Sequence, residues 1–389
     1  MEFDEAEENI LNFFKPIKRN SIFEISRYIP KLILIKQVKK IKYKKFVKSC
    51  IDTQKYIYKI PNTILLKVSG HTSEIISICF SPCGNFIATG STDSTVIFHN
   101  TNFNSSEILG KHMNKLRNHN NGVNAIAFSH QNNYFVSGSL DRTAILYEVS
   151  YMNSLIFLKN IITLRGHTDG INTVAFSQYS QYSKYGKEAS YLATGSYDES
   201  VIIYDISKTS YLGRVLLKLK AHNQAINSVS FHPFNNFIAS GSFDKSTIVC
   251  DLSNAGKLLL KLQDHEDFVY TVHFSPCGNY LATGSFDETI IVYGMAIINF
   301  GMKLFHLKGH NDKVLSISFS PCGKYLVTGS KDKTANIYSI IKEKEENILK
   351  KIDHIKLIGY PGYILSVCFS PNGKYLAFGC SRQVAVIYG

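Results

Sequence analysis

One stretch of about fourteen residues recurs along the chain, and most copies carry an aspartate at the same place. Three copies read IASGSFDKSTIVCD at 238–251, LATGSFDETIIVYG at 281–294 and LVTGSKDKTANIYS at 326–339. Self-similarity of this kind constrains a fold strongly, because each copy forms one small unit that buries its apolar face only against its neighbours. The repeat is therefore the first guide to the architecture.

A histidine precedes each of the first six copies and fixes their spacing. These histidines are His71, His119, His167, His222, His265 and His310, at intervals of 48, 48, 55, 43 and 45 residues. The aspartate follows 22 residues later in five copies and 31 residues later in the third, where residues 178–190 replace a short turn. These aspartates are Asp93, Asp141, Asp198, Asp244, Asp287 and Asp332. A seventh copy, at 360–388, has Tyr360 and Arg382 at the two marker positions.

Each copy has the composition of short β-strands. A β-branched and aromatic run ends at a Pro/Gly turn such as SPCG, a second run such as YLATGS follows, and a third follows the aspartate. One more strand-like run precedes the next histidine, as at 258–265. Four strands in a unit of about 40–50 residues are typical of a propeller blade. The sequence thus predicts an all-β fold.

The G-H…F-S-P…G-S-x-D…Y-D arrangement resembles the WD-repeat family of β-propellers. The resemblance covers residues 61–389 and implies a ring of seven four-stranded blades. Residues 1–60 lie outside it, and we expect them to form a separate, mostly helical extension. The last copy stops after its third strand, whereas the stretch NTILLKV (62–68) has no blade of its own. A ring with an open edge strand would be a liability. We therefore expect residues 62–68 to complete the seventh blade.

The resemblance also implies a role for the repeated polar residues. Histidine, aspartate, a Ser/Thr four residues before the aspartate, and an aromatic are expected to form a buried hydrogen-bond network that holds each blade together. The Ser/Thr positions are Thr89, Ser137, Thr194, Ser240, Thr283 and Thr328. Six such sets could be taken for hydrolase triads, but no active site requires six copies. We expect no catalytic residues.

The chain has no tryptophan, so the aromatic position of each blade holds another residue: Phe98, Tyr147, Tyr204, Cys250, Tyr293, Tyr338 or Tyr388. Phe98 and Cys250 lack a good donor. We expect weaker networks in blades one and four, and none in blade seven, where Tyr360, Phe378 and Arg382 replace histidine, threonine and aspartate.

In WD-repeat proteins three positions of each blade surround the channel mouth on one face, called here the top face. They are the residue before the aspartate and the residues three and five after the histidine. From these positions the expected partner-binding residues are Tyr197, Phe243, Phe268, Tyr270, Phe286, Tyr363, Asn124, Asn172 and Asn227. Clustered exposed aromatics usually mark a contact surface. The blade-three insertion, with three tyrosines, is expected on the opposite face as a surface loop or a second contact.

Residues 1–60 do not repeat and are basic. They hold 14 Lys/Arg and 7 Asp/Glu, a net charge of +7, and the other 329 residues carry +6. Two short helices are expected, capped by Asp4 and Ser21. Eight lysines lie between positions 31 and 48. Three interpretations stay open: a helix packed on the propeller, a contact with RNA through residues 31–48, or a segment that resembles an F-box without its opening Leu-Pro.

The expected function is a non-catalytic scaffold that docks proteins or peptides in a multiprotein complex. An F-box would instead imply a substrate receptor of a ubiquitin ligase, and the lysines an RNA-associated assembly factor. No phosphate-binding loop, nucleophile elbow or metal-ligand cluster occurs, so neither a cofactor nor a metal is expected. No apolar run is long enough to span a bilayer, and the acidic start is unlike a secretory signal. We expect a monomeric propeller with reduced cysteines, in the cytoplasm or nucleus.

Overall fold

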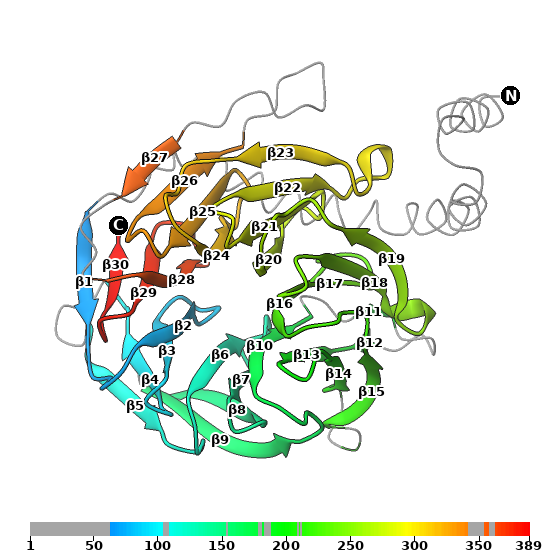
Figure 1. Cartoon of the computed structure of the whole chain (residues 1–389). Helices are drawn as coiled ribbons and strands as arrows, with labels where there is room; N and C mark the ends of the chain where they lie inside the picture. Colours follow the sequence, from blue (N-terminus) through cyan, green and yellow to red (C-terminus); the bar gives the residue numbers. More distant parts are fainter. Residues whose placement is uncertain are drawn as a thin grey trace, which may run out of the picture. The chain divides into compact units, whose positions relative to one another are not determined.

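Seven four-stranded antiparallel sheets stand side by side around a central axis (Figure 1). The computed structural model describes residues 63–103, 109–152, 155–177, 181–182, 188–207, 210, 212–340, 354–357 and 362–389. The all-β, seven-bladed prediction is confirmed. The expected helices and the lysine segment of residues 1–60, and the marker Tyr360, lie outside the described residues.

The blades follow the repeats, each running from an inner to an outer strand. Blades one and two consist of β2 (Ile75–Phe80), β3 (Phe86–Ser91), β4 (Val96–Asn100) and β5 (His112–Leu116), then β6 (Val123–Phe128), β7 (Tyr134–Ser139), β8 (Ala144–Met152) and β9 (Leu155–Leu164). Blades three and four consist of β10 (Ile171–Phe176), β13 (Tyr191–Ser196), β14 (Val201–Asp205) and β15 (Arg214–Leu219), then β16 (Ile226–Phe231), β17 (Phe237–Ser242), β18 (Thr247–Asp251) and β19 (Lys257–Leu262). Blades five and six consist of β20 (Val269–Phe274), β21 (Tyr280–Ser285), β22 (Ile290–Gly294) and β23 (Lys303–Leu307), then β24 (Val314–Phe319), β25 (Tyr325–Ser330), β26 (Ala335–Ser339) and β27 (His354–Leu357).

The seventh blade is assembled from both ends of the repeat region. Its strands are β28 (Ile364–Phe369), β29 (Leu376–Cys380), β30 (Ala385–Tyr388) and β1 (Ile64–Val68), in the order β1-β30-β29-β28. Strand β1 runs antiparallel to β30, with Val68 opposite Ala385 and Ile64 opposite Tyr388. The predicted closure by residues 62–68 is confirmed, and the edge of β30 is paired.

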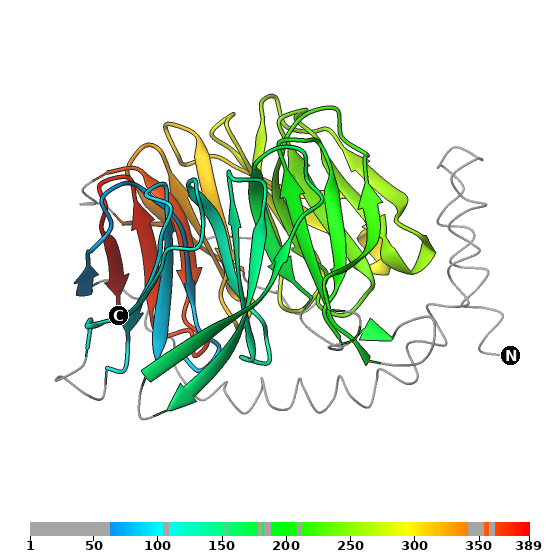
Figure 2. The same ribbon diagram turned by 90° about the horizontal axis from the view of Figure 1, so that it is seen from below.

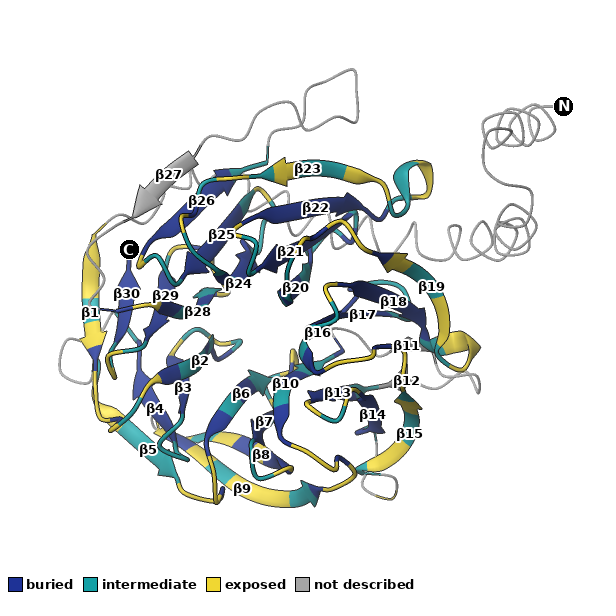
Figure 3. Ribbon diagram, viewed as in Figure 1, coloured by how far each residue is buried: buried dark blue, intermediate teal, exposed yellow. Residues whose placement is uncertain are grey.

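The core lies between the blades, where the middle strands are covered on both faces. Strands β3 and β4 are buried along their whole length, whereas half of the residues of β15 and of β19 on the rim are exposed (Figure 3). The recurring glycine of the T/S-G-S motif permits the close approach of the next blade. A Cβ on Gly284 would lie 2.8 Å from Val314 Cγ1, and one on Gly379 would lie 3.0 Å from Ile75 Cγ2 across the closure.

Hydroxyl groups on the inner strands tie neighbouring blades together. The backbone N–H of Val272 donates to Ser228 Oγ at 3.1 Å, and that of Val367 donates to Ser316 Oγ at 3.0 Å. The same bond crosses the closure, from Ile78 N–H to Ser366 Oγ at 3.2 Å. Each pairs an inner-strand donor that its own blade leaves free.

Two features interrupt the regularity of the ring. Strands β8 and β9 are 9 and 10 residues long and project beyond the other blades (Figure 2). The blade-three insertion contains a two-stranded pairing of β11 (Gln181–Tyr182) with β12 (Glu188–Ala189). The side chains of its tyrosines are not among those that the structure describes. Within the described ranges, no helix has the length and apolar character needed to cross a membrane.

Candidate functional site

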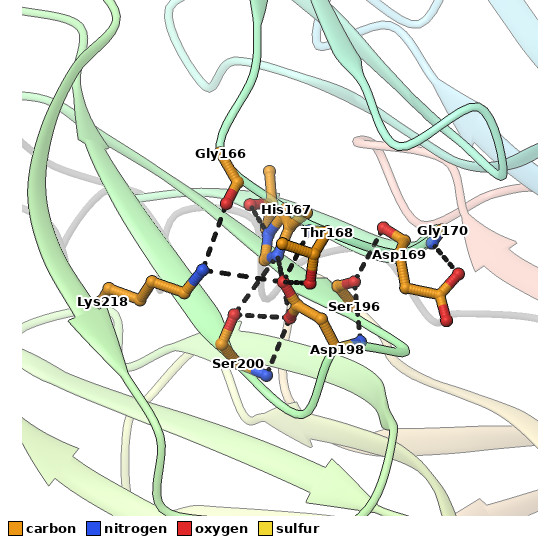
Figure 4. A network of polar contacts seen from close by, with 10 residues as sticks. Gly166, His167, Thr168, Asp169, Gly170, Ser196, Asp198, Ser200 and Lys218 are labelled. Carbon is orange, nitrogen blue, oxygen red and sulfur yellow. Dashed lines mark hydrogen bonds and ion pairs between the residues drawn. The ribbon is translucent and has the colours of Figure 1, made fainter.

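The histidine, aspartate and hydroxyl of blades one to six lie together at the end of each blade. Histidine Nδ1 is 2.8–3.0 Å from the nearest aspartate oxygen, and histidine Nε2 is 2.7–2.9 Å from the Ser/Thr hydroxyl. Because a carboxylate only accepts, Nδ1 carries the proton, and Nε2 of a neutral imidazole then accepts from the hydroxyl. Figure 4 shows the blade-three set, in which His167, Asp198 and Ser200 point toward one another.

Two further hydroxyl positions complete the network. Both recur in the first six copies, although the predicted network did not include them. The residue two after the aspartate donates its hydroxyl to that carboxylate at 2.5–2.6 Å; these residues are Thr95, Thr143, Ser200, Ser246, Thr289 and Thr334. The serine two before the aspartate accepts the aspartate N–H at 3.0–3.1 Å; these serines are Ser91, Ser139, Ser196, Ser242, Ser285 and Ser330. The G-S-x-D-x-[ST] spelling of each copy carried this signal.

The carboxylates are stabilised in their charged form. Burial alone would raise the pKa of Asp93, but hydrogen bonds from Thr95, from the backbone of Thr72 and from His71 outweigh it and hold the pKa at about 2. The pKa values of Asp198, Asp287 and the other three network aspartates are lowered in the same way. Burial lowers the pKa of His71 and His167 despite the neighbouring carboxylates, which favours neutral imidazole.

These sets have the connectivity of a hydrolase triad, but their hydroxyls are not accessible. Thr89, Ser137, Thr194, Thr283 and Thr328 are 0% exposed, and the histidines are buried. A nucleophile needs an open approach for its substrate. The arrangement instead joins the turn that follows the second strand to the loop that precedes the first.

The tyrosines at the aromatic position lie next to the network hydroxyls. Tyr147 interacts with Ser137, Tyr204 with Thr194 and Tyr338 with Thr328. The hydroxyl of Tyr293 interacts with Thr283 and also donates to Asp264 at 3.1 Å. In blades one and four, which have Phe98 and Cys250, the network distances are 2.9 Å, as in the other blades. In bond length, therefore, these two blades do not differ from the rest.

Blade seven keeps the turn without the network. Phe378 is 0% exposed and packs edge-to-face on Tyr388, with ring centroids 5.6 Å apart, whereas Arg382 is exposed. Gln383 has the left-handed φ of 64° found at the same place in the other blades, such as 69° at Glu288. Apolar packing thus replaces the polar contacts there.

Backbone geometry brings the three top-face positions of each blade together. In all seven blades the residue before the aspartate, or before Arg382, donates its N–H to the carbonyl of the residue three after the histidine position, at 2.9–3.1 Å. The residue five after the histidine is the one skipped by a bulge between the first two strands. Bulges re-aim side chains, and sequence alone gave no sign of this one.

The aromatics of blades three to five form one continuous cluster. Ring centroids lie 6.5 Å apart for Tyr197 and Phe243, 4.5 Å for Phe243 and Phe268, 5.7 Å for Phe268 and Phe286, and 5.2 Å for Tyr270 and Phe286. Tyr197 is 40% exposed, and the three phenylalanines are half-buried. We call these five residues the aromatic cluster.

The remaining expected contact residues are placed differently. Tyr363 of blade seven is 38% exposed and lies beside Lys331, whose Nζ is 5.6 Å from its ring centroid. The asparagines bind one another and the next blade: Asn124 Nδ2 donates to Asn172 Oδ1 at 3.2 Å, and Asn172 Nδ2 donates to the carbonyl of Ile226 at 3.0 Å. Asn227 Nδ2 likewise donates to the carbonyl of Val269 at 3.4 Å. These amides have partners inside the ring.

Metal-binding chemistry has no candidate in the part of the chain that is described, where no three His, Cys, Asp or Glu side chains are grouped to hold an ion.

Comparison with known proteins gives a family and one partial relative. The model of the family described as WD domain, G-beta repeat matches residues 62–100, 110–148, 158–205, 213–251, 256–294, 301–339 and 353–387. Nuclear distribution protein nudF 2 of Aspergillus clavatus is 33% identical over 75 residues, which are 19% of this chain and 16% of that protein. The match to that relative therefore spans under a fifth of either protein. Each of the seven matches spans the outer strand of one blade and the three inner strands of the next. The matches thus cover all seven blades, and the chain belongs to the WD40 repeat family.

Proposed function

We propose that the protein is a non-catalytic scaffold that docks a partner protein or peptide on the aromatic cluster of its top face. WD40 propellers generally act as non-catalytic interaction scaffolds. The polar residues that could do chemistry here are engaged in holding each blade together. What distinguishes one blade from another is the top-face side chains.

The observation that carries the proposal is the clustering of Tyr197, Phe243, Phe268, Tyr270 and Phe286 on three adjacent blades. The equivalent positions of blade one hold Thr92, Glu74 and Ile76, so the fold does not require aromatic residues there. Large aromatic side chains at the centre of a contact surface supply much of the binding energy in protein complexes. Clustered aromatic side chains that stay partly exposed usually mark an interaction surface.

The test is affinity purification of the intact protein and of a Phe243→Ala/Phe268→Ala/Phe286→Ala variant. We expect the variant to lose specific interactors, because truncating one such anchor typically weakens binding by about 2 kcal/mol or more. A matched control is Phe157→Ala, which removes an aromatic that is 46% exposed on the outer strand β9. It should keep every interactor.

Folding of each variant is checked by its thermal unfolding. If the triple variant is folded and its interactors equal those of the intact protein, the aromatic cluster is not the docking surface. The same conclusion follows if Phe157→Ala loses the same interactors.

A further inference from the structure

Blade six places two lysines beside the aromatic cluster. Lys313 and Lys331 occupy the two top-face positions joined by a backbone hydrogen bond, in which Lys331 N–H donates to the carbonyl of Lys313 at 3.0 Å. Both side chains are half-buried. No other blade has two like charges at this pair of positions; the pair in blade five is Phe286 and Phe268, and that in blade one is Thr92 and Glu74.

The two ammonium groups are held by aromatic rings on either side of blade six. Lys313 Nζ lies 4.1 Å from the ring centroid of Phe286 in blade five, and Lys331 Nζ lies 5.6 Å from that of Tyr363 in blade seven. Cation–π contacts restrict a side chain but do not neutralise its charge. The lysines are thus oriented but still cationic.

Neighbouring carboxylates do not neutralise this pair. Asp312 Oδ1 accepts the backbone N–H of Lys313 at 2.8 Å, and Asp332 is bound by His310 and Thr334. Across the described residues, no ion pair joins the ammonium of Lys313 or Lys331 to a carboxylate. Neither ammonium group is therefore paired with an anionic side chain among the described residues.

Resting on the function proposed above, we propose that the partner is an acidic peptide segment. One aromatic or aliphatic side chain of this peptide contacts Phe243, Phe268 and Phe286. Adjacent Asp or Glu carboxylates of the peptide bind Lys313 and Lys331. The apolar anchor supplies affinity, and the paired charges supply register and orientation.

A single-stranded nucleic acid would also combine aromatic and cationic contacts, but the ring faces do not suit it. Bases bind such surfaces by stacking on free ring faces. Phe243 and Phe268 are stacked on each other at 4.5 Å with an interplanar angle of 30°, and Phe286 is stacked by Tyr270 at 21° and approached by Lys313. The cluster therefore has little free ring face for a base, and a peptide is favoured.

The test selects peptides from a randomised dodecapeptide display library for binding to three proteins. These are the full-length protein, its Lys313→Gln/Lys331→Gln variant and the control variant Lys245→Gln/Lys333→Gln. The control removes the same charge from exposed lysines in the aspartate turns. We expect the intact protein and the control to enrich peptides with an aromatic or aliphatic residue next to Asp/Glu. A labelled selected peptide should lose about tenfold in affinity with the Lys313→Gln/Lys331→Gln variant, because each of two ion pairs is worth up to a factor of about five.

Four results would overturn the inference. Enrichment of apolar peptides without acidic residues, equal in all three proteins, would leave the docking surface in place but remove the acidic partner. Tighter binding of a labelled U12 RNA than of any selected peptide, lost in Lys313→Gln/Lys331→Gln, would assign the lysines to nucleic acid. A more than tenfold gain when phosphoserine replaces the acidic residue would assign them to phosphate. If no peptide is enriched on any of the proteins, the docking function fails together with the inference.

Discussion

At the scale of single residues, each network aspartate serves several donors at once. Asp287 accepts from His265 Nδ1 at 2.8 Å, from the Thr289 hydroxyl at 2.6 Å and from the backbone N–H of Glu266 at 3.0 Å. Removing the carboxylate leaves these donors without an acceptor, and an unsatisfied buried donor costs more than the bond itself contributed.

We expect Asp287→Ala to lower the free energy of unfolding by about 1–3 kcal/mol, as measured by urea denaturation. The control Glu266→Ala removes an exposed carboxylate next to His265 but keeps the backbone donor, and its effect should be within about 0.5 kcal/mol. Equal stability of Asp287→Ala and the intact protein would mean that the network does not stabilise the blade.

At the scale of strands and blades, the sequence predicted the repeat unit well because local signals agree. The G-S-x-D turn, the SPCG turn and the β-branched runs of each copy indicate the same four strands. The features that it did not predict depend on contacts between blades. Ser228 and Ser316 look like ordinary strand residues until a neighbouring backbone N–H is placed beside them. The interblade asparagine contacts, such as that of Asn172 with Ile226, have the same origin.

The recurring glycine gives a prediction at this scale. A methyl group on Gly284 would meet Val314 Cγ1 at 2.8 Å and Ile317 Cδ1 at 2.9 Å on the inner strand of the next blade. Gly284→Ala should therefore destabilise the protein by about 1–3 kcal/mol, because a well-packed interface must shift to admit the methyl group.

Chemical denaturation of a double-mutant cycle with Val314→Ala tests the cause. Trimming Val314 makes room for the added methyl group, so the two substitutions together should cost less than the sum of their separate effects. Additive losses would place the cost of the alanine within its own blade, where Thr271 Cγ2 would also lie 2.9 Å from the added methyl group, and not between blades.

At the scale of the whole molecule, we expect stability to depend on closing the ring. Val68 of β1 is 3% exposed and packs with Ile75 and Ile387 on both sides of the junction between blades seven and one. Without β1, the edge of β30 would be unpaired and this cluster would be open to water. Because each blade packs on two neighbours, the loss should be felt around the ring, and a single cooperative transition is expected for the closed form.

Two truncations separate closure from the extension. Deleting residues 1–69 removes β1, and with it Val68 and Leu66 of this cluster. Burial of one large apolar side chain is worth about 1.5–3 kcal/mol. We therefore expect the unfolding free energy to fall by about 3 kcal/mol or more. Deleting residues 1–60 keeps β1 and should leave the melting temperature unchanged, in accord with our proposal that the propeller domain spans residues 61–389. Calorimetry of both proteins decides between the alternatives. Equal melting temperatures would mean that β1 does not stabilise the ring, and unfolding of the shorter truncation would place the domain boundary before residue 60.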